Sequence, residues 1–330
     1  MAGTGTAHLR PASETLLRVE DLVVEFPAGR QKVHAVSGVS LDIRRGETLG
    51  LVGESGCGKS TTGKAIIQLP APTAGRVRFA GAELTGLAGK RLRQVRTHLQ
   101  LIFQDPISSL NPRRKVRDIL AEPLRIWGRG GKAEQSARVR EALDAVGLDP
   151  DVALDRRPHQ FSGGQCQRIS IARALVMQPD LIICDEPVSA LDVSVQAQIL
   201  NLLDELKARY DLTLVFIAHD LAVVKHVSSR VAVMYLGKVC EVGDPDALYA
   251  RPAHPYTAAL LASIPVPDPG VRPADADLLS GELPSPVDPP SGCRFRTRCP
   301  RAQPHCAAEE PRIRQVGHDQ FVACHFPLVG

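Results

Sequence analysis

The sequence predicts an α/β fold, in which apolar strands alternate with helices along the chain. Two segments, 181–185 and 214–218, are almost entirely apolar, as expected for strands buried on both faces of a parallel sheet. A glycine-rich loop joins a strand at 48–52 to a following helix, an order that is typical of α/β proteins. Further strands are expected at 17–26, 39–43 and 99–103.

Helical patterns follow several of these strands, at 59–69, 165–177 and 192–210. The segment 105–159 is also expected to be mostly helical, and its clearest helix spans 132–146, ended by Gly147. One side of that helix is expected to carry Ala137, Leu143 and Val146.

The chain changes character after residue 230. A β-hairpin is predicted to turn at Gly237, between strands at 231–236 and 238–242. A short helix is expected at 256–263. From Pro252 to Pro290 proline is frequent, which indicates an extended linker around that helix.

Composition excludes several classes of protein. The 330 residues are 44% hydrophobic and 23% charged, as in a soluble globular protein of one large domain with an appendage. A net charge of +4 is too small to indicate nucleic-acid binding, and we interpret the basic run from Arg113 to Arg117 as a solvated helix face. No apolar run is long enough to span a bilayer, and residues 1–13 lack a signal-peptide core, so the chain is expected in the cytoplasm.

The loop after the strand at 48–52 fits the pattern G-x-x-x-x-G-K-[ST]. Its glycines allow backbone N–H groups to converge on phosphate oxygens, and the following helix directs its positive end at them. Lys59 is expected to reach the outer phosphates of a nucleotide, and the Ser60 hydroxyl to bind Mg²⁺. The expected nucleotide contacts are Gly53, Glu54, Ser55, Gly56, Cys57, Gly58, Lys59, Ser60 and Thr61.

An acidic pair ends the buried strand at 181–185. Asp185 is expected to hold Mg²⁺ through its waters, and Glu186 to accept a proton from the water that attacks the γ-phosphate. Phosphoryl transfer depends mainly on positioning and charge neutralisation. Catalysis of ATP hydrolysis therefore needs little more than Lys59, Mg²⁺ and one base. The sequence therefore predicts an ATPase.

A second serine–glycine segment precedes the helix at 165–177. Ser162 offers a hydroxyl, and Gly163 and Gly164 allow close backbone approach, so this helix end is a candidate second phosphate site. The same residues also fit an ordinary serine N-cap with a glycine turn, and the pattern alone leaves both interpretations open.

Together these motifs resemble the ATP-binding cassette (ABC) family over residues 17–250. Ser162, Gly163, Gly164 and Gln165 match that family's signature sequence. The other matches are Gln104 with the glutamine loop, Asp192 with the D-loop, His219 with the switch histidine and Phe26 with the adenine-stacking aromatic.

The resemblance implies an architecture and roles. It implies a RecA-like core with an antiparallel β subdomain and a helical subdomain at about 105–178. Gln104 and His219 would join Glu186 as catalytic residues, with Gln104 also near Mg²⁺, and Ser162 to Gln165 and Asp192 would contact ATP in a head-to-tail pair of cassettes. The expected divisions are a flexible N-terminus at 1–15, the ATPase domain at 16–250, a proline-rich linker at 251–290 and a cysteine-rich extension at 291–330.

Longer motifs are similar to the ATPases of oligopeptide and dipeptide importers, among them His254-Pro-Tyr-Thr257, Gly281-Glu-Leu-Pro-Ser-Pro286 and Gly292 to Pro300. That resemblance implies a paralogous ATPase partner, two transmembrane permeases, an extracytoplasmic solute-binding protein and a place at the cytoplasmic face of the membrane. Nickel, glutathione or a sugar are alternative solutes. A soluble redox-sensing regulatory ATPase is the rival class.

Four of the eight cysteines, Cys293, Cys299, Cys306 and Cys324, crowd into the C-terminal extension. A segment this small and poor in apolar residues needs a staple, so the four thiols predict a metal site. Their wide spacing suits a [4Fe–4S] cluster, which the resemblance also implies. Zinc, with His305 or His325 as further ligands, and free thiols are the alternatives.

Overall fold

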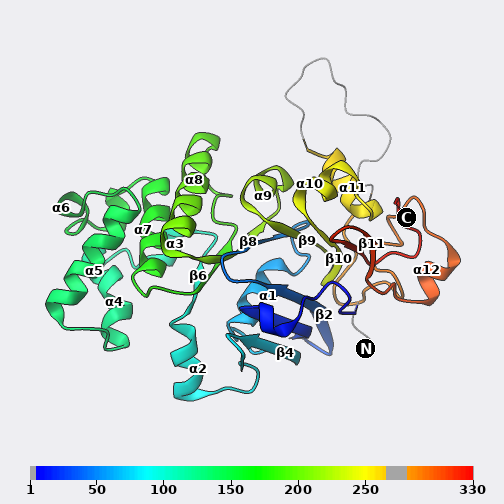
Figure 1. The fold of residues 1–330 in the computed structure, drawn as a ribbon, viewed down its shortest axis with the longest axis horizontal. Coiled ribbons are helices and arrows are strands. Elements are labelled where there is room, and N and C mark those ends of the chain that lie inside the picture. Colours follow the sequence, from blue (N-terminus) through cyan, green and yellow to red (C-terminus); the bar gives the residue numbers. More distant parts are fainter. Residues whose placement is uncertain (1–4, 265–280, 330) are drawn as a thin grey trace, which may run out of the picture. The chain divides into compact units, whose positions relative to one another are not determined.

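The computed structural model describes residues 5–264 and 281–329 (Figure 1). Part of the predicted proline-rich linker, residues 265–280, lies outside this range. Contacts between Cα atoms divide the chain into two compact units: a first unit of residues 1–87 and 216–330, and a second unit of residues 88–215. Strands and helices alternate in the element order, which confirms the α/β class.

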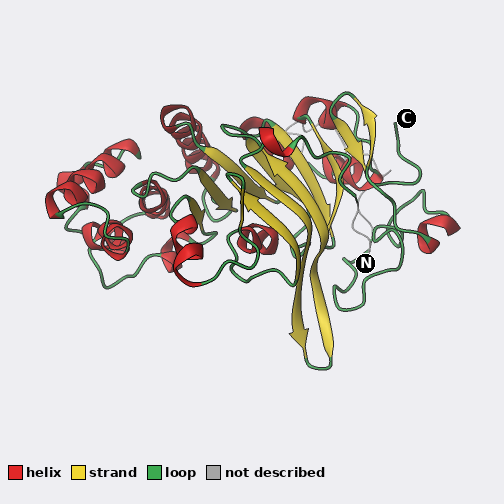
Figure 2. Ribbon diagram, turned by 60° about the horizontal axis from the view of Figure 1, so that its bottom comes forward, coloured by secondary structure: helices red, strands yellow, loops and turns green. Residues whose placement is uncertain are grey.

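The first unit contains an antiparallel sheet with the strand order β2-β1-β4-β5. Figure 2 shows its strands in yellow, among them the long pair β1 and β2. Apolar side chains of β1 at Leu17, Val19 and Leu22 are fully buried and give this sheet its core face. The sequence did not predict β4 and β5. The bounds are β1 (Leu17–Ala28), β2 (Gln31–Ile43), β4 (Ala74–Phe79) and β5 (Ala82–Glu83).

Five further strands of the first unit lie side by side in the order β11-β12-β10-β9-β3. Only β3 and β9 pair in parallel within this set, with Leu49 opposite Arg230, and the other neighbours are antiparallel. The predicted hairpin turn at Gly237 is confirmed between β9 and β10. The bounds are β3 (Thr48–Val52), β9 (Arg230–Tyr235), β10 (Lys238–Gly243), β11 (Arg314–Gly317) and β12 (Gln320–Val322).

The C-terminal extension is part of the first unit, since β12 pairs with β10 through Glu241 and Val322. Its buried Phe295 and Val322 join the core of that unit. The helices of the first unit are η1 (Ala12–Glu14), α1 (Lys59–Ile66), α9 (Leu221–Val227), α10 (Pro245–Ala250), α11 (Pro255–Ala262) and α12 (Pro304–Ala308).

The second unit is mostly helical and holds the parallel strands β6 (Leu99–Ile102) and β7 (Leu181–Asp185). The chain leaves this unit within β8 (Thr213–Ala218). Its helices are α2 (Gly89–Arg96), α3 (Pro106–Ser109), α4 (Val116–Ile126), α5 (Lys132–Ala145), α6 (Pro150–Ala153), η2 (Pro158–Gln160), α7 (Gly163–Leu175) and α8 (Val193–Tyr210).

One prediction for α5 was wrong. Ala137 is exposed, whereas the buried side chains of this segment are Val139, Ala142, Leu143 and Val146. Those four follow the spacing i, i+3, i+4, i+7, which is one face of a helix, and residue 137 falls off that face.

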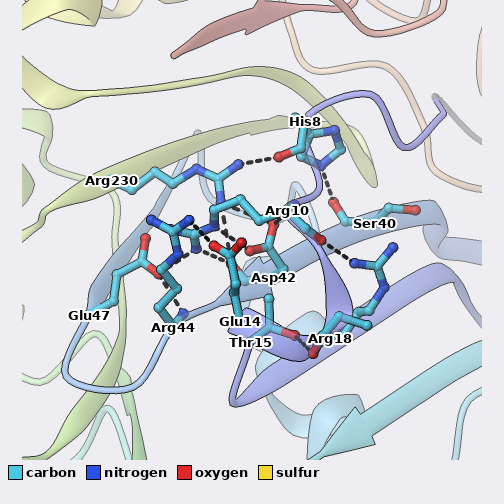
Figure 3. A network of polar contacts seen from close by, with 11 residues as sticks. His8, Arg10, Glu14, Thr15, Arg18, Ser40, Asp42, Arg44, Glu47 and Arg230 are labelled. Atoms are coloured by element: carbon cyan, nitrogen blue, oxygen red, sulfur yellow. Dashed lines mark hydrogen bonds and ion pairs between the residues drawn. The ribbon is translucent and has the colours of Figure 1, made fainter.

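The N-terminal segment is held against the first unit by charged side chains (Figure 3). Arg10 binds Asp42 of β2 through its Nε at 2.6 Å and also pairs with Glu47. Arg230 of β9 binds the same Asp42 at 3.1 Å and donates to the main-chain oxygen of His8. We call these five residues, His8, Arg10, Asp42, Glu47 and Arg230, the N-terminal clasp. The described part of the segment that was expected to be flexible thus makes specific contacts with two strands.

Candidate nucleotide-binding site

The glycine-rich loop lies between β3 and α1 in the first unit. The buried Lys59 turns back over it, and its ammonium donates to the main-chain oxygens of Gly53, at 2.7 Å, and Glu54, at 3.0 Å. The lysine charge is therefore held over the concave side of the loop, where the phosphates of a nucleotide would lie.

Two glycines of this loop are required by close packing against the main chain of neighbouring strands. Gly53 has φ +151°, and a Cβ there would lie 2.1 Å from the main-chain oxygen of Met234. Gly58 has φ +101°, and its Cβ would lie 2.3 Å from the main-chain oxygen of Ala35. Any larger residue would force the backbone of β2 or β9 away from the loop, so both glycines fix the path of the chain as well as its approach to phosphate.

The N-terminus of α1 fits an anionic ligand. Its N-cap residue, Gly58, has no side chain to satisfy the first N–H groups of the helix. Ser60, which sits in the first turn, adds a hydroxyl of the kind that binds Mg²⁺ beside a nucleotide. Burial raises the pKa of the neighbouring Cys57 thiol, so no thiolate opposes an incoming phosphate. The donor set of this loop fits Mg-ATP.

The acidic pair lies at the end of β7 in the second unit. Asp185 is 2% exposed, and the strand before it is buried throughout. The amide Nε2 of Gln104, just beyond β6, donates to Oε2 of Glu186 at 3.0 Å. The fold thus places two of the predicted catalytic residues in contact. Burial also raises the pKa of the adjacent Cys184 to about 12, so that thiol stays neutral.

Ser162 caps α7 with its own hydroxyl, which accepts from the N–H of Gln165 at 3.3 Å, and the Gln165 side chain accepts from the N–H of Ser162. This reciprocal capping box is the ordinary local role of such a serine. A Cβ at Gly164 would lie 2.5 Å from Val195 of α8, so packing between α7 and α8 requires that glycine. A Cβ at Gly163 would make only an ordinary van der Waals contact, with Leu191.

The structure also places three further predicted residues, Asp192, Phe26 and His219. Asp192 caps α8 and accepts from the N–H of Val195 at 3.0 Å. Phe26 lies on β1 opposite Val33 and is 37% exposed, as an aromatic that receives a base must be. His219 is exposed directly after β8. Their roles toward ATP stay predictions.

The sequence did not predict which residues hold the phosphate loop from outside. The hydroxyl oxygen of Tyr256 accepts from the N–H of Glu54 at 2.9 Å. Arg298 binds the Glu54 carboxylate with two nitrogens, at 2.7 and 3.0 Å. Both belong to motifs that mark the peptide-importer subfamily, but their partner could not be read from those motifs.

The four C-terminal cysteines, Cys293, Cys299, Cys306 and Cys324, line one small cavity together with Phe295 and His325. Burial raises the pKa of the Cys293 and Cys324 thiols to about 11, so both are protonated at neutral pH unless a cation binds them. Within residues 5–264 and 281–329, no three histidine, cysteine, aspartate or glutamate side chains are arranged as ligands of one metal ion. The predicted metal cluster is therefore not supported by this arrangement.

The loop, the acidic strand end and the α/β sheets define an ATPase of the phosphate-loop class. Residues 36–189 match the ABC transporter family, and residues 240–306 match the C-terminal region of oligopeptide/dipeptide transporters. The chain is 53% identical to the putative oligopeptide transport ATP-binding protein YkfD of Bacillus subtilis, over 94% of this chain and 95% of that protein. It is also 53% identical to the oligopeptide transport ATP-binding protein OppF of Salmonella typhimurium, over 90% and 92%.

Solved structures support the same family. The dimeric ATP-binding cassette MJ0796 bound to ADP and phosphate has a TM-score of 0.64 at 29% identity, covering 69% of this chain and 98% of that one. The cassette cbiO1 of Clostridium perfringens gives the same score and identity over 72% and 91%. The chain belongs to the ABC transporter family, as one of its ATP-hydrolysing subunits. None of the helices in the described part of the chain combines the length and hydropathy needed to cross a bilayer.

Proposed function

We propose that this chain is the ATPase of an importer, coupling ATP hydrolysis to the uptake of di- and oligopeptides across the cytoplasmic membrane. The observation that carries this proposal is its similarity, at 51–53% identity over 90% or more of the chain, to proteins named for peptide import or oligopeptide transport. The match to the oligopeptide/dipeptide transporter C-terminal region supports the same solute class.

In this proposal the phosphate loop binds ATP and the end of β7 supplies the base. Lys59 and the N-terminus of α1 hold the phosphates, while Ser60 and Asp185 hold Mg²⁺, which neutralises charge on the transferring phosphoryl group. Glu186 takes the proton of the attacking water. The hydrogen bond from Gln104 to Oε2 helps to fix the orientation of the Glu186 carboxylate.

The proposed assembly contains a second, paralogous ATPase, two transmembrane permeases and an extracytoplasmic solute-binding protein, with this chain at the cytoplasmic face. The signature residues Ser162 to Gln165 would complete the ATP site of the companion ATPase, and His219 would contact the γ-phosphate. The solved relative MJ0796 is a dimer with ADP and phosphate, which supports pairing of cassettes.

Replacement of Glu186 by glutamine tests the catalytic assignment. Because a general base contributes about 10²–10⁴-fold to rate, Glu186→Gln should lower ATP turnover of the assembled complex at least about 100-fold. It should leave the dissociation constant for Mg-ATP within about threefold of the wild type. The matched control is Glu141→Gln, an exposed glutamate of α5 in the same unit, which should keep full activity. Turnover unchanged in Glu186→Gln would refute the role of this residue.

The C-terminal thiols are proposed to hold a structural [4Fe–4S] cluster. Four cysteine thiols around one cavity are the donor set of such a cluster, and a bound cation would offset the raised pKa values of Cys293 and Cys324. Anaerobic purification followed by an ultraviolet–visible spectrum and metal analysis tests this. Absorbance near about 400 nm that Cys299→Ser removes would support it, and stoichiometric zinc without that absorbance would replace iron–sulfur by zinc.

A further inference from the structure

The phosphate loop is held from outside at its second residue. Glu54 follows Gly53 in the loop, and its main-chain N–H and its carboxylate are both engaged by residues more than 200 positions away. Tyr256 of α11 accepts from the N–H, and Arg298 of the C-terminal extension binds the carboxylate with both terminal nitrogens. We call Glu54, Tyr256 and Arg298 the C-terminal clasp.

This clasp is well shielded from water. The Arg298 side chain is 5% exposed and the Glu54 side chain 26%, and Tyr256 is fully buried. The Arg298 guanidinium also lies over the ring of Tyr235, 5.8 Å from its centroid. A bidentate, charge-assisted pair in such surroundings has one geometry and is stronger than an exposed ion pair.

A second contact from the same extension supports the far side of the loop. Arg294, which is 7% exposed, donates to the main-chain oxygen of Leu236. The next residue, Gly237, donates its N–H to the main-chain oxygen of Cys57 at 2.8 Å. The loop is therefore supported at two points, Glu54 and Cys57, by groups that the extension orients.

The two arginines are sequence neighbours of two cavity-lining cysteines. Cys293 precedes Arg294, and Cys299 follows Arg298. Between them Phe295 lines the cysteine cavity and packs against Tyr235 and Tyr256, with ring centroids 5.2 and 5.3 Å apart. One short segment thus joins the wall of the cysteine cavity to the phosphate loop.

We propose that Arg298 and Tyr256 are positioning residues for ATP binding, which act through Glu54 to hold the phosphate loop in its binding conformation. Two physical effects contribute. A loop that is already ordered loses less conformational entropy when it binds nucleotide. In addition, Arg298 neutralises a carboxylate that would otherwise repel the phosphates from within the loop. The inference rests on the proposed role of this loop in binding Mg-ATP.

The alternative is that the clasp only attaches the extension to the first unit. Loss of Arg298 would then lower thermal stability and leave the nucleotide affinity of the folded protein unchanged. The two roles therefore differ in a measurement of affinity made well below the melting temperature.

The experiment measures equilibrium binding of a fluorescent ATP analogue with Mg²⁺ to the full-length chain, together with thermal melting without nucleotide. Arg298→Gln should weaken binding about tenfold, which corresponds to about 1.4 kcal/mol. Glu54→Gln should weaken it less, because it removes the repelling carboxylate as well as the contact. The double variant should resemble Glu54→Gln, since Arg298 then has no carboxylate to neutralise. Arg298→Lys, which keeps the charge but loses the bidentate geometry, should recover part of the affinity.

The matched control is Arg10→Gln, which breaks the ion pairs of Arg10 with the buried carboxylates of Asp42 and Glu47 in the same unit. It should lower the melting temperature without changing the affinity. Wild-type affinity in folded Arg298→Gln and Glu54→Gln, or equal losses in Arg10→Gln, would overturn the inference. If Arg298→Gln does not fold, Glu54→Gln and Tyr256→Phe carry the test. A wild-type chain that binds no Mg-ATP would instead refute the proposed nucleotide site.

Discussion

The N-terminal clasp and the C-terminal clasp use the same chemistry on different kinds of partner. In both, a carboxylate that is mostly shielded from water binds arginine from a distant part of the chain: Asp42 binds Arg10 and Arg230, and Glu54 binds Arg298. Asp42 of the N-terminal clasp lies within β2, and Arg230 lies at the start of β9. Glu54 of the C-terminal clasp lies in a loop between a strand and a helix.

This difference indicates what each clasp can control. Strand residues already have their main-chain groups in a sheet, so an ion pair between them adds to stability and moves nothing that binds a ligand. A glycine-rich loop has many accessible conformations, so a contact there selects the one that binds nucleotide. We therefore expect changes in the N-terminal clasp to appear as lost stability, and changes in the C-terminal clasp as lost affinity.

The largest expected effect is that of Asp42→Asn. Burial alone would raise the pKa of Asp42, but the charges of Arg230 and Arg10 outweigh it, and the net pKa is lowered. An amide in its place removes the negative charge that Arg230 and Arg10 share and leaves Glu47 as the ion-pair partner of Arg10, which should lower the free energy of unfolding by about 3–5 kcal/mol. Urea denaturation of the full-length chain measures this change.

Asp155→Asn is the control for that measurement, because Asp155 is an exposed partner of Lys115 and should leave the unfolding free energy unchanged. The folded fraction of Asp42→Asn should bind Mg-ATP as the wild type does. A tenfold loss of affinity in Asp42→Asn would break the distinction between the two clasps.

An intermediate effect is expected from pH, through His8. Burial lowers the pKa of His8 from 6.5 to about 4, and among the residues that the structure describes its Nδ1 has no hydrogen-bond partner that could stabilise an added proton. The folded protein therefore keeps His8 neutral while the unfolded chain takes up a proton below pH 6.5, so stability falls as the pH drops from 6.5 toward 4. Between pH 7 and pH 5 this amounts to about 2 kcal/mol.

Denaturation of the wild type and of His8→Gln at both pH values isolates this contribution. The wild type should lose about 2 kcal/mol more than His8→Gln between pH 7 and pH 5. His318→Gln changes a histidine whose side chain is 98% exposed and should behave like the wild type. Equal pH dependence of His8→Gln and the wild type would show that His8 is accessible to protons in the folded state.

The smallest expected effect is that of Tyr256→Phe, which tests whether the C-terminal clasp controls nucleotide affinity. It removes one hydroxyl from the C-terminal clasp and leaves the N–H of Glu54 without that acceptor. The loop conformation that binds nucleotide should therefore become less favourable by about 1 kcal/mol. Affinity for Mg-ATP should fall about fivefold, while stability changes little. Tyr210→Phe, in the second unit, is the matched control and should keep wild-type affinity. Loss of stability without loss of affinity in Tyr256→Phe would show that the C-terminal clasp, like the N-terminal clasp, affects stability and not nucleotide binding.

Sequence patterns predicted the elements that carry the chemistry but not the packing around them. The glycine-rich loop, the acidic end of β7 and the Gly237 hairpin were expected where the structure has them. The weak strands β4 and β5 and the short helix α12 were not predicted, because their few residues carry no clear periodicity. The error at Ala137 has a related cause, since a small apolar residue fits either face of a helix.

The sequence by itself determined the local chemistry of this protein, because a phosphate loop, a helix cap or an acidic strand end is made by neighbours in the chain. From such patterns it predicted roles for Lys59, Glu186 and Ser162. Only the tertiary structure decided that Arg298 binds Glu54, 244 positions away, and that Arg10 and Arg230 share Asp42. Such pairs depend on how strands and loops are brought together, and an arginine's sequence position does not show which of many carboxylates it will meet.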